Sequence, residues 1–312
     1  MQQKLLLFDL DDTLLRSDKT ISRHTLEVLE RCREQGYLIG VSTSRGEINS
    51  LSYIAELRPD VVISSGGAAV KYIDQYIYTA EFTEKETNQI IKTVREICGS
   101  DCRMTIDTLK ANFWSHGRNR DEIDPSWRDA IFADFSNLHE RALKLCAKIS
   151  QPELAVQVAE TLTDCDCIKF VNSDWYKFTK KEATKESAIK KFCEVSGISL
   201  SDVTAFGDDL PDIGMLKLCG TGVAMGNALD EVKTAVGSAS VGDTVTINGT
   251  AYEVVTTSVA EENQYSINDL KKLVSDGDKI VVGSQTYVAM TDTAGGADKI
   301  GDNDASVITK EK

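Results

Sequence analysis

The segment KLLLFDLDDTLL, residues 4–15, constrains the fold most, because it places three carboxylates at the end of an apolar run. Residues 5–8 predict a buried strand, and Asp9, Asp11 and Asp12 follow it. Carboxylates crowded at such a strand end repel one another and are costly to desolvate. A divalent cation such as Mg²⁺ removes that repulsion, and an aspartate can also act as a nucleophile. A strand-exit turn or helix cap uses the same residue types, so this stretch alone leaves a structural role open.

Two further apolar runs follow the same plan. The segments YLIGVST at 37–43 and PDVVISSGG at 59–67 predict continuous buried strands of the kind found in parallel sheets. Before the first of them, Ser22 and Gly36 bracket a helical pattern as cap residues, and a second helix is expected over about 46–57. Alternating strands and helices predict a parallel α/β sheet with ligands at the carboxyl ends of its strands.

Polar groups recur at these predicted strand exits and helix starts. Thr43 and Ser44 follow the second strand, where hydroxyls and a helix N-terminus suit an anion, although a plain helix cap is an alternative. Lys185 opens a predicted helix against the dipole preference, which points to an anionic partner; a solvated surface lysine is the alternative. Asp208 and Asp212 follow a later apolar strand, so acidic residues again mark a carboxyl end.

From about residue 80 the pattern changes to an α+β type. Thr83 and Glu86 form a capping box that predicts a helix with its isoleucines inward. The segment 103–117 alternates like paired strands, and another strand pair is expected over 167–181. This insertion differs from the parallel core on either side of it.

Composition narrows the function classes. Asp and Glu outnumber Lys and Arg by 49 to 35, for a net charge of −14, which argues against nucleic acid or an anionic membrane as the main partner. No apolar run approaches the roughly 18 residues of a membrane span. Asp9 cuts the N-terminal apolar segment short, so no signal peptide is predicted. Eight scattered cysteines indicate reduced thiols, and we expect a cytoplasmic protein.

In this order the polar groups resemble the motifs of the haloacid dehalogenase (HAD) superfamily of phosphotransferases. The matching residues are D-x-D-x-T at 9–13, V-x-T-x-R at 41–45, Lys185, and G-D-D-x-x-D at 207–212. The sequence GVAMGNA at 222–228 is similar to the Cof-like branch. The resemblance covers residues 1–236. It implies a Rossmann-like parallel-sheet core, residues 1–80 and 181–236, with an α+β cap, residues 81–180, inserted between motifs two and three.

The resemblance also implies catalytic and metal-binding roles. Asp9 would be the nucleophile and a Mg²⁺ ligand. The Asp11 carboxylate would be the general acid and then the general base, while its main-chain oxygen binds Mg²⁺. Asp208 would complete the metal ligands, with Asp212 supporting bound water.

Phosphate binding would fall to the Leu10 main chain, Thr43, Ser44 and Lys185. One residue departs from the branch pattern: Pro211 stands where Asn is usual, and it offers no side-chain donor and no N–H. Gly66 likewise stands where the branch often has Asn after the third strand.

Two functions follow for this chain. The first is Mg²⁺-dependent hydrolysis of a small phosphorylated metabolite, such as a sugar phosphate, through an aspartyl-phosphate. The second is a catalytically impaired HAD-like binding or scaffold protein, in which Pro211 and the lack of a recognisable final core strand have disabled the enzyme. The substrate and the oligomeric state are left open.

Residues 237–312 have a different character. They are rich in Gly, Thr, Val and Asp, and they begin with the pair Gly237-Ser238, which would fit a fusion, natural or artificial. Two similar segments, 242–255 and 277–290, predict a β-rich interaction module built on hairpins. The expected turns lie at Asn248-Gly249 and Gly283.

Overall fold

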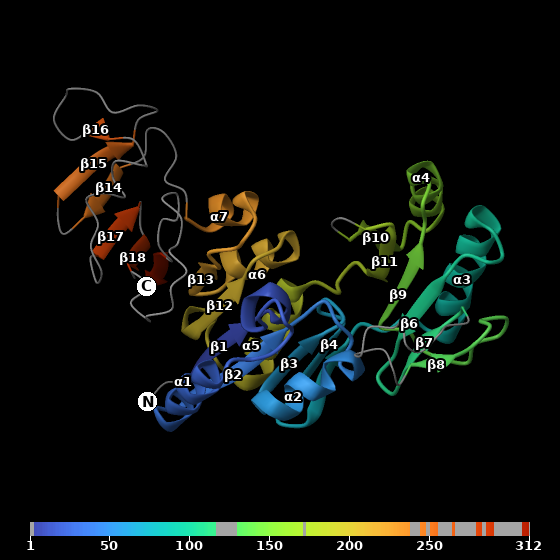
Figure 1. The fold of residues 1–312 in the computed structure, drawn as a ribbon, viewed down its shortest axis with the longest axis horizontal. Helices are drawn as coiled ribbons and strands as arrows, with labels where there is room; N and C mark the ends of the chain where they lie inside the picture. The colour runs from blue at the N-terminus through green and yellow to red at the C-terminus, as the bar shows by residue number, and fades with distance from the viewer. Residues whose placement is uncertain are drawn as a thin grey trace. The chain divides into compact units, whose positions relative to one another are not determined.

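A computed structural model describes residues 3–116, 130–170 and 173–237, together with the C-terminal strands 244–247, 250–254, 264–265, 279–282, 285–289 and 308–311. The chain divides into two compact units (Figure 1). Unit 1 comprises residues 1–38 and 197–312, and unit 2 comprises residues 39–196. None of the helices described is both long enough and apolar enough to cross a membrane.

Unit 1 contains three parallel strands in the order β13-β12-β1. Its elements in chain order are β1 (Lys4–Phe8), η1 (Leu10–Leu14), α1 (Arg23–Glu34), η5 (Leu200–Asp202), β12 (Val203–Gly207), η6 (Leu210–Asp212), α6 (Ile213–Leu218), β13 (Thr221–Ala224) and α7 (Asp230–Gly237). The predicted strands over 5–8 and before Asp208 are therefore confirmed. Helix α6 was not predicted from the sequence.

Strand β1 pairs with β12 and buries alternate side chains. Leu5 and Leu7 are at most 1% exposed, and the Phe8 ring stacks on Phe206 of β12 with centroids 4.5 Å apart. Burying such side chains stabilises the folded state by about 1.5–3 kcal/mol each. The apolar half of residues 4–15 thus fixes the strand whose end carries Asp9.

The caps predicted for the first helix are confirmed. The Ser22 hydroxyl accepts a hydrogen bond from the Thr25 N–H, which satisfies one of the free donors at the start of α1. Gly36 follows the helix with φ +89°, a backbone region that glycine adopts without steric cost.

Unit 2 begins with strands that follow the core pattern. Its elements here are β2 (Tyr37–Ser42), η2 (Ile48–Ser50), α2 (Leu51–Leu57), β3 (Val61–Ser64), β4 (Ala69–Tyr72), β5 (Gln75–Thr79) and, after the insertion, α5 (Lys185–Ser196). Strands β2 and β3 are parallel, and β3-β4-β5 continue antiparallel. The second helix begins at Leu51, after a 3₁₀ turn, and not near residue 46 as expected.

Strands β4 and β5 were not predicted from the sequence, because their connecting turn lacks the glycine that is usual in such turns. Ile73 and Asp74 both have positive φ, 45° and 62°. Tight hairpin turns of this kind normally contain a Gly, and Asp74 without one is only a weak turn signal.

The insertion forms a six-stranded sheet in the order β10-β11-β9-β6-β7-β8. Its elements are α3 (Glu84–Cys98), β6 (Met104–Asp107), β7 (Asn112–Trp114), β8 (Ile131–Phe132), β9 (Lys144–Lys148), α4 (Pro152–Thr161), β10 (Cys165–Lys169) and β11 (Trp175–Lys180). The predicted capping box and both strand pairs are confirmed. One face of this cap sheet packs on α3 and α4 through Val94, Val158 and Phe178, each fully buried.

All eight cysteines lie in the described residues and are free thiols. Burial raises the pKa of Cys165 and of Cys167 to about 11, so both thiols of this C-x-C pair keep their protons near neutral pH. Metal ligation and nucleophilic attack both require the thiolate.

The C-terminal strands form a second six-stranded sheet, β16-β15-β14-β17-β18-β19. They are β14 (Thr244–Ile247), β15 (Thr250–Val254), β16 (Gln264–Tyr265), β17 (Lys279–Val282), β18 (Gln285–Ala289) and β19 (Ile308–Glu311). The strands of both repeats pair antiparallel, β14 with β15 and β17 with β18, as predicted. The predicted turns at Asn248-Gly249 and Gly283 lie outside the described residues.

Candidate active site

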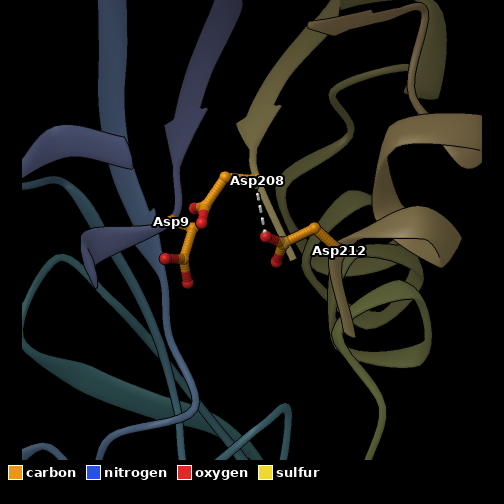
Figure 2. Close-up of side chains that lie close together, drawn as sticks. All are labelled: Asp9, Asp208 and Asp212. Atoms are coloured by element: carbon orange, nitrogen blue, oxygen red, sulfur yellow. Dashed lines mark hydrogen bonds between the residues drawn. The ribbon is translucent and has the colours of Figure 1, made fainter. Parts of the chain in front are cut away.

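Three carboxylates of unit 1 converge at one sheet edge (Figure 2). Asp9 directly follows β1 and Asp208 directly follows β12; because these strands are parallel neighbours, both residues leave the sheet at the same end. One ligand oxygen from each of Asp9, Asp208 and Asp212 lies within 4.8 Å of the others. The convergence of the first and last acidic motifs thus follows from parallel pairing.

Backbone amides hold the third carboxylate in place. Oδ2 of Asp212 accepts hydrogen bonds from the N–H groups of Asp208 at 2.9 Å and Asp209 at 3.1 Å. Gly207 permits this arrangement, since a Cβ there would lie 2.6 Å from the Cβ of Asp212. The glycine before the acidic pair is therefore a packing requirement of the carboxylate cluster.

The environment of Asp208 disfavours its charge. Burial raises the pKa of Asp208 to about 6, with the carboxylates of Asp212, Asp12 and Asp209 adding to the rise, although a hydrogen bond donated by Thr13 at 2.5 Å opposes it. A cation between these oxygens would remove the repulsion. The donor set consists only of carboxylate oxygens, which fits a hard divalent ion such as Mg²⁺.

Asp11 lies in the kinked turn that follows Asp9. The turn closes with a hydrogen bond of 2.8 Å from the Leu15 N–H to the Leu10 carbonyl, five residues back. The Asp11 carboxylate accepts from Lys19 Nζ at 3.0 Å, and in the described chain the three-carboxylate cluster does not include it. Asp9 and Asp11, two residues apart, therefore have different surroundings, as two different tasks would need.

Unit 2 carries the residues of the second motif. The Thr43 carbonyl accepts from the Gly66 N–H at 3.0 Å, and the Thr43 hydroxyl accepts from the Arg45 N–H at 3.1 Å. The Ser44 carbonyl accepts from Lys144 of the cap sheet at 2.7 Å. These bonds tie the loop after β2 to the loop after β3 and to the cap sheet.

Lys185 is the first residue of α5 and is only 3% exposed, so the alternative of a solvated surface lysine is wrong. Gly67 packs directly against the start of this helix. A Cβ on Gly67 would lie 2.2 Å from the Thr184 carbonyl oxygen and 2.9 Å from the Lys185 nitrogen. The small residues after the third strand thus let α5 begin where it does.

The sequence analysis missed three polar residues of the cap sheet: Asp107, Lys144 and Lys177. All three are at most 8% exposed. The available signal in the sequence was the position of Lys177 between the large apolar residues Tyr176 and Phe178 of β11.

A family model described as haloacid dehalogenase-like hydrolase matches residues 6–254. The 5-amino-6-(5-phospho-D-ribitylamino)uracil phosphatase YcsE of Bacillus subtilis is 28% identical over 236 residues, covering 74% of this chain and 86% of that protein. The pyridoxal phosphate phosphatase YbhA of Escherichia coli is 26% identical over 266 residues, covering 79% of this chain and 96% of that protein.

A solved structure, the HAD subclass IIB sugar phosphatase BT4131, shares the fold with a TM-score of 0.63 at 23% identity, covering 74% of this chain and 91% of that one. The predicted α/β fold class is thereby confirmed, and so is the prediction of a hydrolase whose relatives are named phosphatases. Since the family model spans most of the sequence, the chain belongs to the haloacid dehalogenase-like hydrolases.

Proposed function

We propose that this chain hydrolyses a small phosphorylated metabolite, a sugar phosphate or similar phosphomonoester, through an aspartyl-phosphate and with Mg²⁺. The observation that carries the proposal is the cluster of Asp9, Asp208 and Asp212 at one sheet edge. The relatives named above, phosphatases of pyridoxal phosphate and of a ribitylaminouracil phosphate, support the substrate class.

The proposed metal ligands are the Asp9 and Asp208 carboxylates and the Asp11 main-chain oxygen, with Asp212 supporting bound water. The oxygen-only donor set and the raised pKa of Asp208 support this assignment. Bound there, the ion would offset negative charge on the carboxylates and on the substrate phosphate.

The chemical steps fall to two carboxylates. An Asp9 oxygen attacks phosphorus, and the bond from phosphorus to the leaving oxygen breaks while the Asp11 carboxylic acid protonates that oxygen. Asp11, now ionised, takes a proton from water as the water attacks the aspartyl-phosphate. Inorganic phosphate leaves, and Asp9 and protonated Asp11 are restored.

We assign the phosphoryl oxygens to the Leu10 main chain, Thr43, Ser44 and Lys185. The order of the four motifs along the chain supports this assignment. Fixed donors aimed at those oxygens provide most of the catalysis in phosphoryl transfer.

The alternative of an impaired binding protein rests on Pro211 and on the lack of a recognisable final core strand; the structure bears on the first of these. This residue lies in the first turn of η6, where its missing N–H leaves no helical hydrogen bond unmade. Asp212 next to it keeps both amide hydrogen bonds. The local geometry therefore favours the enzyme.

Hydrolysis of p-nitrophenyl phosphate by the full chain tests the proposed function. We expect turnover with Mg²⁺ and none after removal of metal by EDTA, with recovery when Mg²⁺ is restored. The Asp208→Ala variant should need a much higher Mg²⁺ concentration because it lacks one ligand. No turnover by wild type at any Mg²⁺ concentration would favour the binding-protein alternative.

Mg²⁺ binding is expected to weaken in acid. Because the pKa of Asp208 is raised to about 6 in the metal-free protein, the carboxyl is protonated below that pH and must lose a proton to bind metal. The apparent affinity should then fall by up to about tenfold per pH unit below about pH 6. Calorimetric titration with Mg²⁺ at pH 5, 6 and 7 measures this; equal affinity at all three values would contradict it.

A further inference from the structure

The second face of the cap sheet is polar and yet buried. Cross-strand register places on this face, opposite α3 and α4, a set of residues each at most 8% exposed: Thr105, Asp107, Asn112, Lys144, Cys146 and Lys177. Polar groups removed from water are costly unless each finds a partner. The partners of this face therefore show what it is built to do.

Loops of the same unit cover most of this face. The backbone at Gly46 lies so close that a Cβ there would be 2.8 Å from Oδ2 of Asp107. The Asn112 side-chain amide donates a hydrogen bond to the side-chain oxygen of Asn49. The loop after β2 thus covers the Asp107 and Asn112 side of the cap sheet.

Lys144 is fully neutralised within this unit. Its ammonium lies 2.8 Å from an Asp107 carboxylate oxygen and donates to the Ser44 carbonyl at 2.7 Å. Burial acts to lower the pKa of Lys144, but the charges of Asp107 and Cys146 and the hydrogen bond to Asp107 together outweigh it and raise that pKa. This lysine is a structural tie between the cap sheet and the loop that follows β2.

Lys177 differs from Lys144 in its surroundings. Its side chain is 8% exposed, and within the described ranges no hydrogen bond or ion pair reaches its ammonium. The ammonium lies 3.5 Å from the position that a Cβ of Gly66 would occupy, so it reaches the loop after β3. Burial, followed by the charges of Lys144 and Lys185, lowers the pKa of Lys177.

We propose that Lys177 is a specificity residue that binds a second anionic group, a phosphate or a carboxylate, on the phosphomonoester substrate. The inference rests on the proposed function. A buried cation that feels the positive charges of Lys144 and Lys185 is stabilised when an anion arrives. The ammonium lies next to Gly66, since a Cβ there would be in van der Waals contact with it at 3.5 Å.

The transferred phosphate is assigned to Lys185 and not to Lys177. Lys185 is the lysine of the third motif, while Lys177 comes from a cap strand and stands opposite Cys146 in the sheet. Lys177, a cation on the cap sheet, would pair with a second anionic group of the substrate, which a simple monoester lacks. Substrates with one phosphate and no other charge would offer Lys177 no second anion.

Titration calorimetry with non-hydrolysable ligands tests this on the full chain with Mg²⁺. The ligands are alkane bisphosphonates of two to six carbons, the ω-carboxyalkylphosphonates of the same lengths, and the matching alkylphosphonates with one charge group. We expect one length of bisphosphonate or carboxyalkylphosphonate to bind about 10–100-fold more tightly than its alkylphosphonate, the range of a charge-assisted hydrogen bond. The series with the higher affinity identifies the second group as phosphate or carboxylate.

Lys177→Met should abolish this advantage and leave alkylphosphonate binding within about threefold, while Lys177→Arg should retain it. Lys180→Met is the matched control on the same strand, because the Lys180 ammonium pairs with Glu86 at 2.9 Å. The proposal is overturned if no two-anion ligand gains affinity in wild type, if the gain survives Lys177→Met, or if alkylphosphonate binding falls equally. Failure of the proposed function would appear separately, as absent p-nitrophenyl phosphate hydrolysis.

Discussion

Replacing Asp9 by asparagine is expected to lower phosphatase turnover by roughly 10³-fold or more. The substitution keeps the size of the side chain but removes the anionic oxygen that attacks phosphorus. It also weakens one of the three carboxylates that converge in unit 1. Steady-state hydrolysis of p-nitrophenyl phosphate at saturating Mg²⁺ measures the loss and separates it from weaker metal binding.

Asp11→Asn is the matched control for this experiment. It sits two residues away, lies outside the three-carboxylate cluster and keeps its main-chain oxygen, so Mg²⁺ binding should survive. Loss of proton transfer alone should cost on the order of 10²–10⁴-fold in turnover. A very acidic leaving group needs little protonation, so formation of the phospho-enzyme should be partly rescued for Asp11→Asn and not for Asp9→Asn.

A burst of p-nitrophenolate on mixing would report that rescue. Substantial turnover by Asp9→Asn, in a preparation shown free of other phosphatases, would mean that the aspartyl-phosphate mechanism is wrong for this chain. Equal losses and no burst in both variants would instead mean that the two carboxylates do not divide the roles as proposed.

The parallel strands of the core were among the parts of the fold that the sequence could predict. Residues 5–8 and 37–43 are continuous apolar runs, and their burial in β1 and β2 follows from composition alone. The hairpin of β4 and β5 was missed, because Ile73 and Asp74 adopt the turn without a glycine. Ile rarely adopts positive φ, and a single Asp without a glycine is a weak turn signal, so only the packed sheet reveals that hairpin.

The residues of the candidate site also fall into those that the sequence could predict and those that it could not. The resemblance of the motifs to the family already implied that Asp9 and Asp208 act together, and the structure gives the reason, because they follow adjacent parallel strands. Lys177 could not be predicted, because its importance depends on what surrounds it. Its neighbour Lys144 has Asp107 as a counter-ion, and only the folded cap sheet shows that, among the residues the structure describes, no ion pair reaches Lys177.

A large loss of stability is expected when Gly67 is replaced, although this residue is not among the proposed substrate contacts. Gly67 has φ +106°, and a Cβ there would lie 2.2 Å from the Thr184 carbonyl oxygen and 2.3 Å from its carbon. Contacts this short with backbone atoms cannot be relieved by a rotamer change. The start of α5, and with it the buried Lys185, would have to move.

Gly67→Ala should therefore lower the free energy of unfolding by about 3 kcal/mol or more, combining left-handed strain with a backbone clash. Gly66→Ala is the matched control, since φ is +74° and the nearest atom, Lys177 Nζ, lies at an ordinary 3.5 Å; it should cost about 1–2 kcal/mol. Urea unfolding followed by tryptophan fluorescence compares the two variants. Because the helix start carries Lys185, the folded fraction of Gly67→Ala should also bind alkylphosphonates more weakly than Gly66→Ala does. Equal stabilities would show that α5 can shift without cost, and the close approach of Gly67 to Thr184 would then not be what positions Lys185.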